Sequence, residues 1–185
     1  MKRALALATL VVLLLPVALA AKDSRDSRDS GNSLVRFEGG IGVDPVSNGV
    51  GTDPTATTVT RNIVRGVQPP GQIWRIEDLS ANVKTDGRIR VDGRGLLLAG
   101  GNNIGTNGNQ RVFATLICEA TPPFVEHSTS TTGVPLAANG DFRIDDVLSP
   151  APPAVCASPV LLIRSAAGTV HPWFAAGIPK RDNDD

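Results

Sequence analysis

The feature that most constrains the fold is a pair of alternating segments on either side of Asp86-Gly87. Apolar and polar residues alternate over residues 79–83, and apolar residues alternate with charged ones over residues 88–92. A period of two is typical of strands that bury one face and expose the other. Residues 73–98 therefore predict a β-hairpin, around which we interpret the rest of the chain.

The register of this hairpin can be predicted, because directly opposed residues of an antiparallel pair share a face. A two-residue loop would place Val83 opposite Arg90, which sets an apolar side chain beside a charged one. A three-residue loop at residues 85–87 instead places Val83 opposite Ile89. It also gives Gly87 the left-handed third position that a type I turn with a G1 bulge requires. We therefore predict the three-residue loop.

Two further features accompany this hairpin. The apolar phase shifts by one residue before Leu79, which predicts a bulge near Glu77-Asp78. A second hairpin is predicted over residues 134–144, with glycine again third in its loop and Leu136 opposite Phe142. The two hairpins share an arginine and an aspartate at matching offsets from the glycine. A common turn geometry is the favoured explanation, and an internal duplication is the alternative.

Short apolar runs separated by turn signals continue along the chain, and no long stretch shows helical periodicity. Strands that recur about every 8–12 residues predict an all-β sandwich or barrel. We favour a single-domain antiparallel β-sandwich of immunoglobulin-like, Greek-key type with about eight strands. Besides the hairpins, we predict strands in residues 34–38, 57–67, 111–119, 160–164 and 170–178, and loops in residues 41–54 and 100–110.

The first residues predict export. Residues 1–3 are basic, residues 4–19 are almost entirely apolar, and residues 18–20 form a small-x-small cleavage site, the pattern of a secretory signal peptide. The apolar run is shorter than the roughly 20 residues that a bilayer span needs. We predict a signal peptide over residues 1–20, cleavage near Ala20 and no transmembrane span in the mature chain.

The ends of the mature chain lack apolar residues to bury. Residues 21–32, with their Asp-Ser-Arg repeat, predict a disordered charged linker, and residues 180–185 predict a disordered tail. Residues 33–179 remain for one β-sandwich domain of ordinary size. Cys118 and Cys156 are the only cysteines, an even number in an exported chain, and predict a disulfide bond.

The charge balance argues against a general affinity for nucleic acid or for an anionic membrane. Loss of Lys2 and Arg3 with the signal peptide leaves 16 basic against 18 acidic side chains, a net charge near −2. Fourteen of the 18 basic residues in the full sequence are arginine, which indicates a GC-rich genome and hence a bacterium. The sequence therefore predicts a protein of the bacterial periplasm or extracellular space.

Few residues suggest catalysis. Glu119, Glu126 and His127 are the candidates for a secreted hydrolase with a shallow carboxylate and histidine site, because such chemistry needs two carboxylates or an acid and a base across one cleft. Glu126 and His127 would point to opposite faces of a strand. No calcium ladder, phosphate-binding loop or serine elbow is present, so we predict no cofactor and no metal site.

Arginines of the central hairpin suggest binding. Arg88, Arg90 and Arg94 lie on or near its polar face, where they could bind an anionic polysaccharide, and Trp74 could provide a ring for stacking. Interleaved aspartates favour cross-strand ion pairs as the simpler explanation, and the sequence around Trp74 favours the core. The favoured function is a non-enzymatic binding or structural module whose partner is an envelope or extracellular polysaccharide or protein. The hydrolase is the alternative.

Overall fold

The computed structural model describes residues 32–52 and 55–180, with the side chains of residues 47–59 left undescribed. The predicted signal peptide, nearly all of the predicted linker and residues 181–185 lie outside these ranges. The described residues form thirteen strands and no α-helix, so none of their segments is a helix that could cross a membrane. In chain order the strands are β1 (Ser33–Gly42), β2 (Val46–Thr52), β3 (Thr55–Arg61), β4 (Trp74–Arg75), β5 (Asp78–Lys84), β6 (Arg88–Arg94), β7 (Leu97–Leu98), β8 (Arg111–Ile117), β9 (His127–Ser128), β10 (Val134–Pro135), β11 (Phe142–Val147), β12 (Val160–Ser165) and β13 (Trp173–Pro179).

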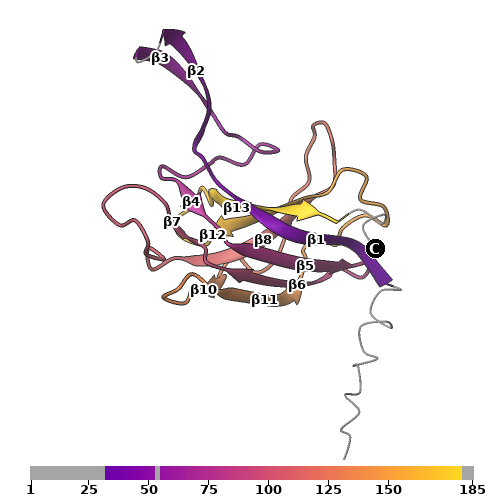
Figure 1. Cartoon of the computed structure of the whole chain (residues 1–185). Helices are drawn as coiled ribbons and strands as arrows, with labels where there is room; N and C mark the ends of the chain where they lie inside the picture. Colours follow the sequence, from indigo (N-terminus) through magenta and orange to yellow (C-terminus); the bar gives the residue numbers. More distant parts are fainter. Residues whose placement is uncertain (1–31, 53–54, 181–185) are drawn as a thin grey trace, which may run out of the picture. The chain divides into compact units, whose positions relative to one another are not determined.

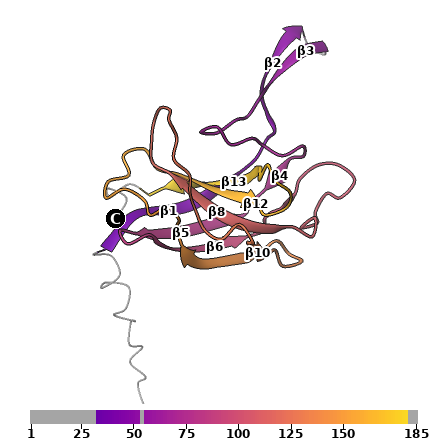
Figure 2. The same cartoon turned by 180° about the vertical axis from the view of Figure 1, so that it is seen from behind.

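Nine of these strands pair into one continuous antiparallel sheet. Its order is β10-β8-β12-β13-β1-β5-β6-β11, and β9 also pairs with β8. The sheet curls, so that β8 and β12 lie behind β1 and β5 in Figure 1 and are seen from the opposite side in Figure 2. The strand pairs β2-β3 and β4-β7 form two small separate sheets. The all-β prediction is confirmed.

Backbone hydrogen bonds join the two ends of the main sheet. Ala137 N, after β10, donates to Asp141 O, before β11, at 2.9 Å. Ser128 of β9 and Ser149, just after β11, exchange two bonds of 3.0 and 2.8 Å. The continuous sheet is therefore close to a barrel. The immunoglobulin-like sandwich that we favoured from the sequence is not confirmed, because no second large sheet faces the first within the described residues.

The first hairpin confirms the predicted register. Val83 pairs with Ile89, and Ala81 pairs with Val91. Gly87 N donates to Lys84 O at 3.0 Å, and Gly87 has a φ of 84°, as the three-residue loop requires. The buried side chains of these four paired residues then face the core, so the alternating charged residues face outward.

The second hairpin is confirmed in its turn but wrong in its pairing. Gly140 N donates to Ala137 O at 2.8 Å, and Gly140 has a φ of 84°. Beyond the bond between Ala137 and Asp141, however, no ladder joins β10 to β11. The backbone of Leu136 bonds outward, since its N–H donates to Gln110 O and its carbonyl accepts from the Asn107 side chain. The chain therefore opens after the turn, and β10 pairs with β8 while β11 pairs with β6.

Two local predictions are also corrected. The phase shift before Leu79 is no bulge: β4 pairs with β7, whereas β5 pairs with β6, so the chain changes partner strands between them. Residues 41–54, predicted as loop, contain the end of β1 and all of β2. The backbone of residues 46–52 pairs with that of residues 55–61 despite the turn-forming dipeptides in this stretch.

The core and the disulfide hold the curled sheet together. Its largest side chains with almost no exposure come from both sides of the sheet and include Phe37, Leu79, Ile89, Phe113, Leu116, Leu161 and Ile163. The predicted disulfide is present and ties Cys118, after β8, to Cys156 in the proline-rich connection before β12. This connection has little strand pairing of its own, so the covalent bond fixes it to the sheet.

Replacement of Gly87 by alanine should lower the free energy of unfolding by about 1–2 kcal/mol, because an L side chain is strained at positive φ. Urea denaturation measures the change. Gly71→Ala is the matched control, since a Cβ there meets no atom within 4 Å and the backbone is not left-handed. Equal stability of the two variants would contradict the predicted turn.

Replacement of both Cys118 and Cys156 by alanine should destabilise the fold by up to about 4 kcal/mol, because the bridge closes a sequence separation of 38 residues in the unfolded chain. Thermal unfolding of the oxidised wild type and the double variant measures this loss. Reductant should lower the melting temperature of the wild type and leave that of the double variant unchanged. A wild type that is insensitive to reductant would contradict a stabilising bridge.

Candidate functional site

The outer face of β6 carries a row of charged side chains. Ile89 and Val91 are buried, so the alternating Arg88, Arg90, Asp92 and Arg94 project away from the core. This placement follows from the period of two, because successive side chains of a strand point to opposite faces. Burial of the apolar side chains on one face of β6 therefore places the charged side chains on its outer face.

Neighbouring strands extend this row into a mixed-charge surface. On β11, Arg143 lies opposite Asp92 and Asp145 lies opposite Arg90. On β5, Ser80 lies opposite Asp92 and Asp78 lies opposite Arg94. Directly opposed side chains are close enough to interact. Ion pairing on a solvated face, which we favoured over ligand binding as the simpler explanation of these arginines, is therefore part of the observed arrangement.

Asp92 lies at the centre of these contacts. Its two carboxylate oxygens lie 3.2 Å from Arg90 Nε and 3.7 Å from Arg143 Nε. Both arginines contact Asp92 through Nε, and within the described residues their terminal Nη groups make no hydrogen bond. The Arg94 side chain likewise has no hydrogen-bonding partner in that part of the chain. The surface thus keeps several guanidinium donors available to a ligand.

These groups surround a shallow hollow of about 570 Å³ that is open to solvent. The Asp141 carboxylate at its rim already has hydrogen-bond donors from the protein, since it accepts from Gly95 N at 3.1 Å and from Asn139 Nδ2 at 2.8 Å. Three arginines and two aspartates give the hollow a formal charge of +1. It is lined by Ser80, Arg90, Asp92, Gly93, Arg94, Asp141, Phe142 and Arg143.

The structure gathers some of the predicted binding residues and separates others. Arg90 and Arg94 line the hollow, whereas Arg88 forms a 2.8 Å ion pair with Asp86 at the turn. Trp74 is only 5% exposed and stacks on Phe174 with ring centroids 4.1 Å apart, so it belongs to the core.

Arg143 is a lining residue that we did not single out from the sequence. The signal for it is its offset from Gly140, which matches that of Arg90 from Gly87. The two hairpins place these arginines at equivalent positions, but the pairing of β6 with β11 decides that both lie beside the same aspartate.

The predicted catalytic residues have separate structural roles. Glu126 forms a 2.5 Å ion pair with Arg164, whose side chain is almost completely buried. Glu119 accepts a 3.1 Å hydrogen bond from Val125 N. This bond lowers the pKa of the Glu119 carboxyl group, because an N–H donor favours the ionised form. Each carboxylate therefore has its own partner.

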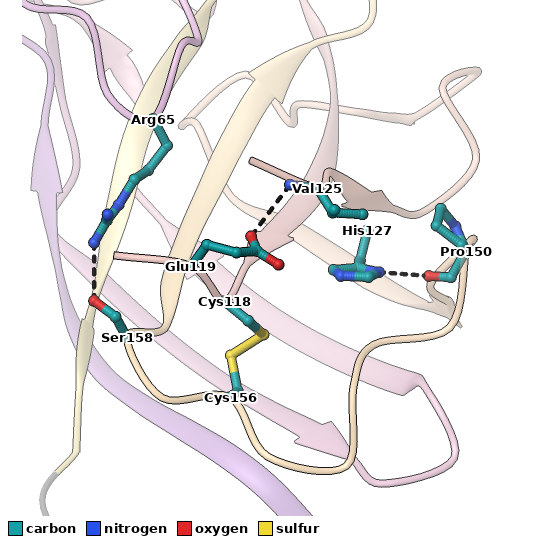
Figure 3. The surroundings of a disulfide bond; sticks show 8 residues. All are labelled: Arg65, Cys118, Glu119, Val125, His127, Pro150, Cys156 and Ser158. Atoms are coloured by element: carbon teal, nitrogen blue, oxygen red, sulfur yellow. Dashed lines mark hydrogen bonds between the residues drawn. A yellow bond between two sulfur atoms is a disulfide. The ribbon is translucent and has the colours of Figure 1, made fainter. Parts of the chain in front are cut away.

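His127 lies in the interior. Its side chain is 4% exposed, and its Nδ1 lies 2.9 Å from Pro150 O, so Nδ1 is the donor because a carbonyl only accepts. The buried Nε2 has no hydrogen-bonding partner among the residues that the structure describes. Figure 3 shows Glu119 and His127 beside the disulfide, with each side chain turned to its own partner. Glu119, Glu126 and His127 make no hydrogen bond to one another, although an electrostatic contribution from His127 also lowers the pKa of the Glu119 carboxyl group.

A search of residues 32–52 and 55–180 finds no group of three or more histidine, cysteine or acidic side chains that could hold a metal ion. Comparison of the chain with models of known protein families, with curated proteins and with solved structures found no match in any of the three. We therefore infer the function of the chain from the chemistry of the side chains described above.

Glu119→Gln should make stability less dependent on pH. The pKa of Glu119 is lower in the folded than in the unfolded chain, so the stabilisation from its charge is present above the ordinary glutamate pKa of about 4.3 and is lost as the pH falls through the folded value. We expect the wild type to melt at a higher temperature than the variant at pH 7 and the gap to close in acid. A gap that is the same at every pH would contradict this role.

Proposed function

We propose that this protein is a non-enzymatic binding module of the bacterial envelope or extracellular space that binds an anionic polysaccharide through the hollow on β5, β6 and β11. The observation that carries the proposal is the cluster of Arg90, Arg94 and Arg143. Arg90 donates a hydrogen bond to Asp92 through Nε, and Arg143 forms an ion pair with it at 3.7 Å through Nε, which leaves their terminal groups available.

The chemistry of arginine supports this ligand class. A guanidinium group offers five donors in a fixed fork and binds carboxylates with two parallel hydrogen bonds. An arginine held through Nε loses less side-chain freedom on binding than a mobile one, which favours affinity. The hollow is open to solvent and polar, so an extended chain can cross it without entering a closed cavity.

Other features support an extracellular location. The predicted signal peptide over residues 1–20 would export the chain, and disulfides such as Cys118–Cys156 persist in oxidising compartments. The mature chain is near neutral, so attraction of a polyanion would depend on the local arginine cluster instead of on the net charge.

The fold provides a rigid support in this proposal. The curled sheet can be treated as a flattened barrel or, as we favoured from the sequence, as an immunoglobulin-like sandwich. Both descriptions place the same outward side chains of β5, β6 and β11 on one surface. The proposed site therefore depends on which strands pair and is the same whether the fold is described as a barrel or as a sandwich.

The proposal predicts that the full chain binds polygalacturonate at low salt and that added salt weakens binding. Arg94→Gln and Arg143→Gln should each weaken it by about tenfold, because a hydrogen bond to a charged group contributes about 1.5–3 kcal/mol. Isothermal titration calorimetry measures these affinities.

Arg75→Gln is the matched control, since Arg75 is 48% exposed and lies outside the hollow. It should bind like the wild type. Equal losses in all three arginine variants would contradict a specific site, and absence of binding to any anionic polysaccharide would contradict the proposed function.

A further inference from the structure

We propose that Asp92 makes the hollow selective for polysaccharides that carry one carboxylate per sugar over densely sulfated polysaccharides. This inference rests on the proposed function and names the ligand class of the same site. In it, Asp92 is a specificity-determining residue that combines an attractive and a repulsive role.

Asp92 is surrounded by all three arginines of the hollow. Arg90 and Arg94 lie two residues before and after it on the same face of β6, a spacing of about 7 Å along a strand in each direction. Arg143 lies directly opposite on β11. The Asp92 side chain is 44% exposed, so a ligand that contacts these arginines also meets the Asp92 carboxylate.

The attractive role comes from the geometry of the two ion pairs. Asp92 accepts a hydrogen bond from Arg90 Nε at 3.2 Å, faces Arg143 Nε at 3.7 Å, and leaves the outer edge of each guanidinium group available. Such an edge can donate hydrogen bonds to a ligand carboxylate. Asp92 thereby orients the donors before the ligand arrives.

The repulsive role comes from the charge balance. One ligand carboxylate neutralises the formal charge of +1 in the hollow, whereas several sulfate groups bring excess negative charge beside Asp92 and Asp141. Like charges that meet in an interface are unfavourable by several kcal/mol, and specificity often depends on such a penalty. Further acids border the hollow, with Asp78 opposite Arg94, Asp145 opposite Arg90 and Glu38 opposite Ser80.

Hydrogen-bonding capacity favours the same ligands. An ionised aspartate only accepts hydrogen bonds, so the Asp92 carboxylate needs donors from whatever covers it. Sugar hydroxyl groups are such donors, and sulfation replaces them with acceptors. The Ser80 hydroxyl opposite Asp92 can also donate to or accept from a sugar hydroxyl. A uronate chain with free hydroxyl groups offers carboxylates to the arginines and hydroxyl donors to the Asp92 carboxylate.

The test compares three polymers with the full chain at one ionic strength: polygalacturonate, dextran sulfate and neutral dextran. The wild type should prefer polygalacturonate over dextran sulfate and should not bind dextran. Asp92→Asn removes the charge with little change of shape and should reduce this preference by at least about tenfold, mainly through tighter binding of dextran sulfate. Calorimetry measures each affinity, and thermal unfolding verifies that the variants are folded.

Two further variants separate charge from position. Asp92→Glu keeps the charge and should keep the preference even if both affinities fall. Asp86→Asn is the matched control, because Asp86 is an exposed aspartate of the same hairpin that pairs with Arg88 outside the hollow. It should leave the preference unchanged.

The outcomes separate the inference from the proposed function. Equal binding of polygalacturonate and dextran sulfate by the wild type, with both lost in Arg94→Gln, would overturn the selectivity and leave the proposed function standing. An equal loss of both affinities in Asp92→Asn would show that Asp92 only positions the arginines and would also overturn it. Binding of neither polymer by the wild type would contradict the proposed function itself.

Discussion

The backbone hydrogen bonds that join the two ends of the main sheet determine the rest of the structure. The bond between Ala137 and Asp141 and the pair of bonds between Ser128 and Ser149 bring β11 beside the strands that border β8. An open sheet of this length would leave two edges able to pair with other chains. Once the sheet curls, every strand has an inner and an outer face, and the outer face of β5, β6 and β11 becomes the surface that carries the arginines.

Local patterns in the sequence predicted the parts of the fold that depend on neighbouring residues. The register of the first hairpin follows from which side chains around Gly87 can share a face, and it was confirmed residue by residue. The second hairpin has the same turn, yet no ladder between β10 and β11 follows it; β10 pairs with β8 and β11 pairs with β6. A local pattern carries no information about such distant partner strands.

The candidate site likewise combines features that the local sequence predicted with contacts between distant residues that it could not predict. Alternation on β6 was sufficient to place Arg90 and Arg94 on one solvated face, but only the pairing of β6 with β11 brings Arg143 to Asp92. Of the three predicted catalytic residues, Glu126 and His127 are adjacent in the chain and Glu119 lies seven residues earlier, and composition alone made them candidates. Their actual partners, Val125, Pro150 and Arg164, include groups from separate elements, and the sequence offered no signal for those contacts.

The position of β13 has a consequence for the order in which the chain can fold. β13 is the last strand, yet it lies between β12 and the first strand, with Ile41 paired to Ala176. Contacts between segments so distant in sequence form slowly, because a long loop must close before they contribute. Until residues 173–179 have emerged, β1 has a partner on one side only, and completion of the sheet must therefore wait for the synthesis of β13.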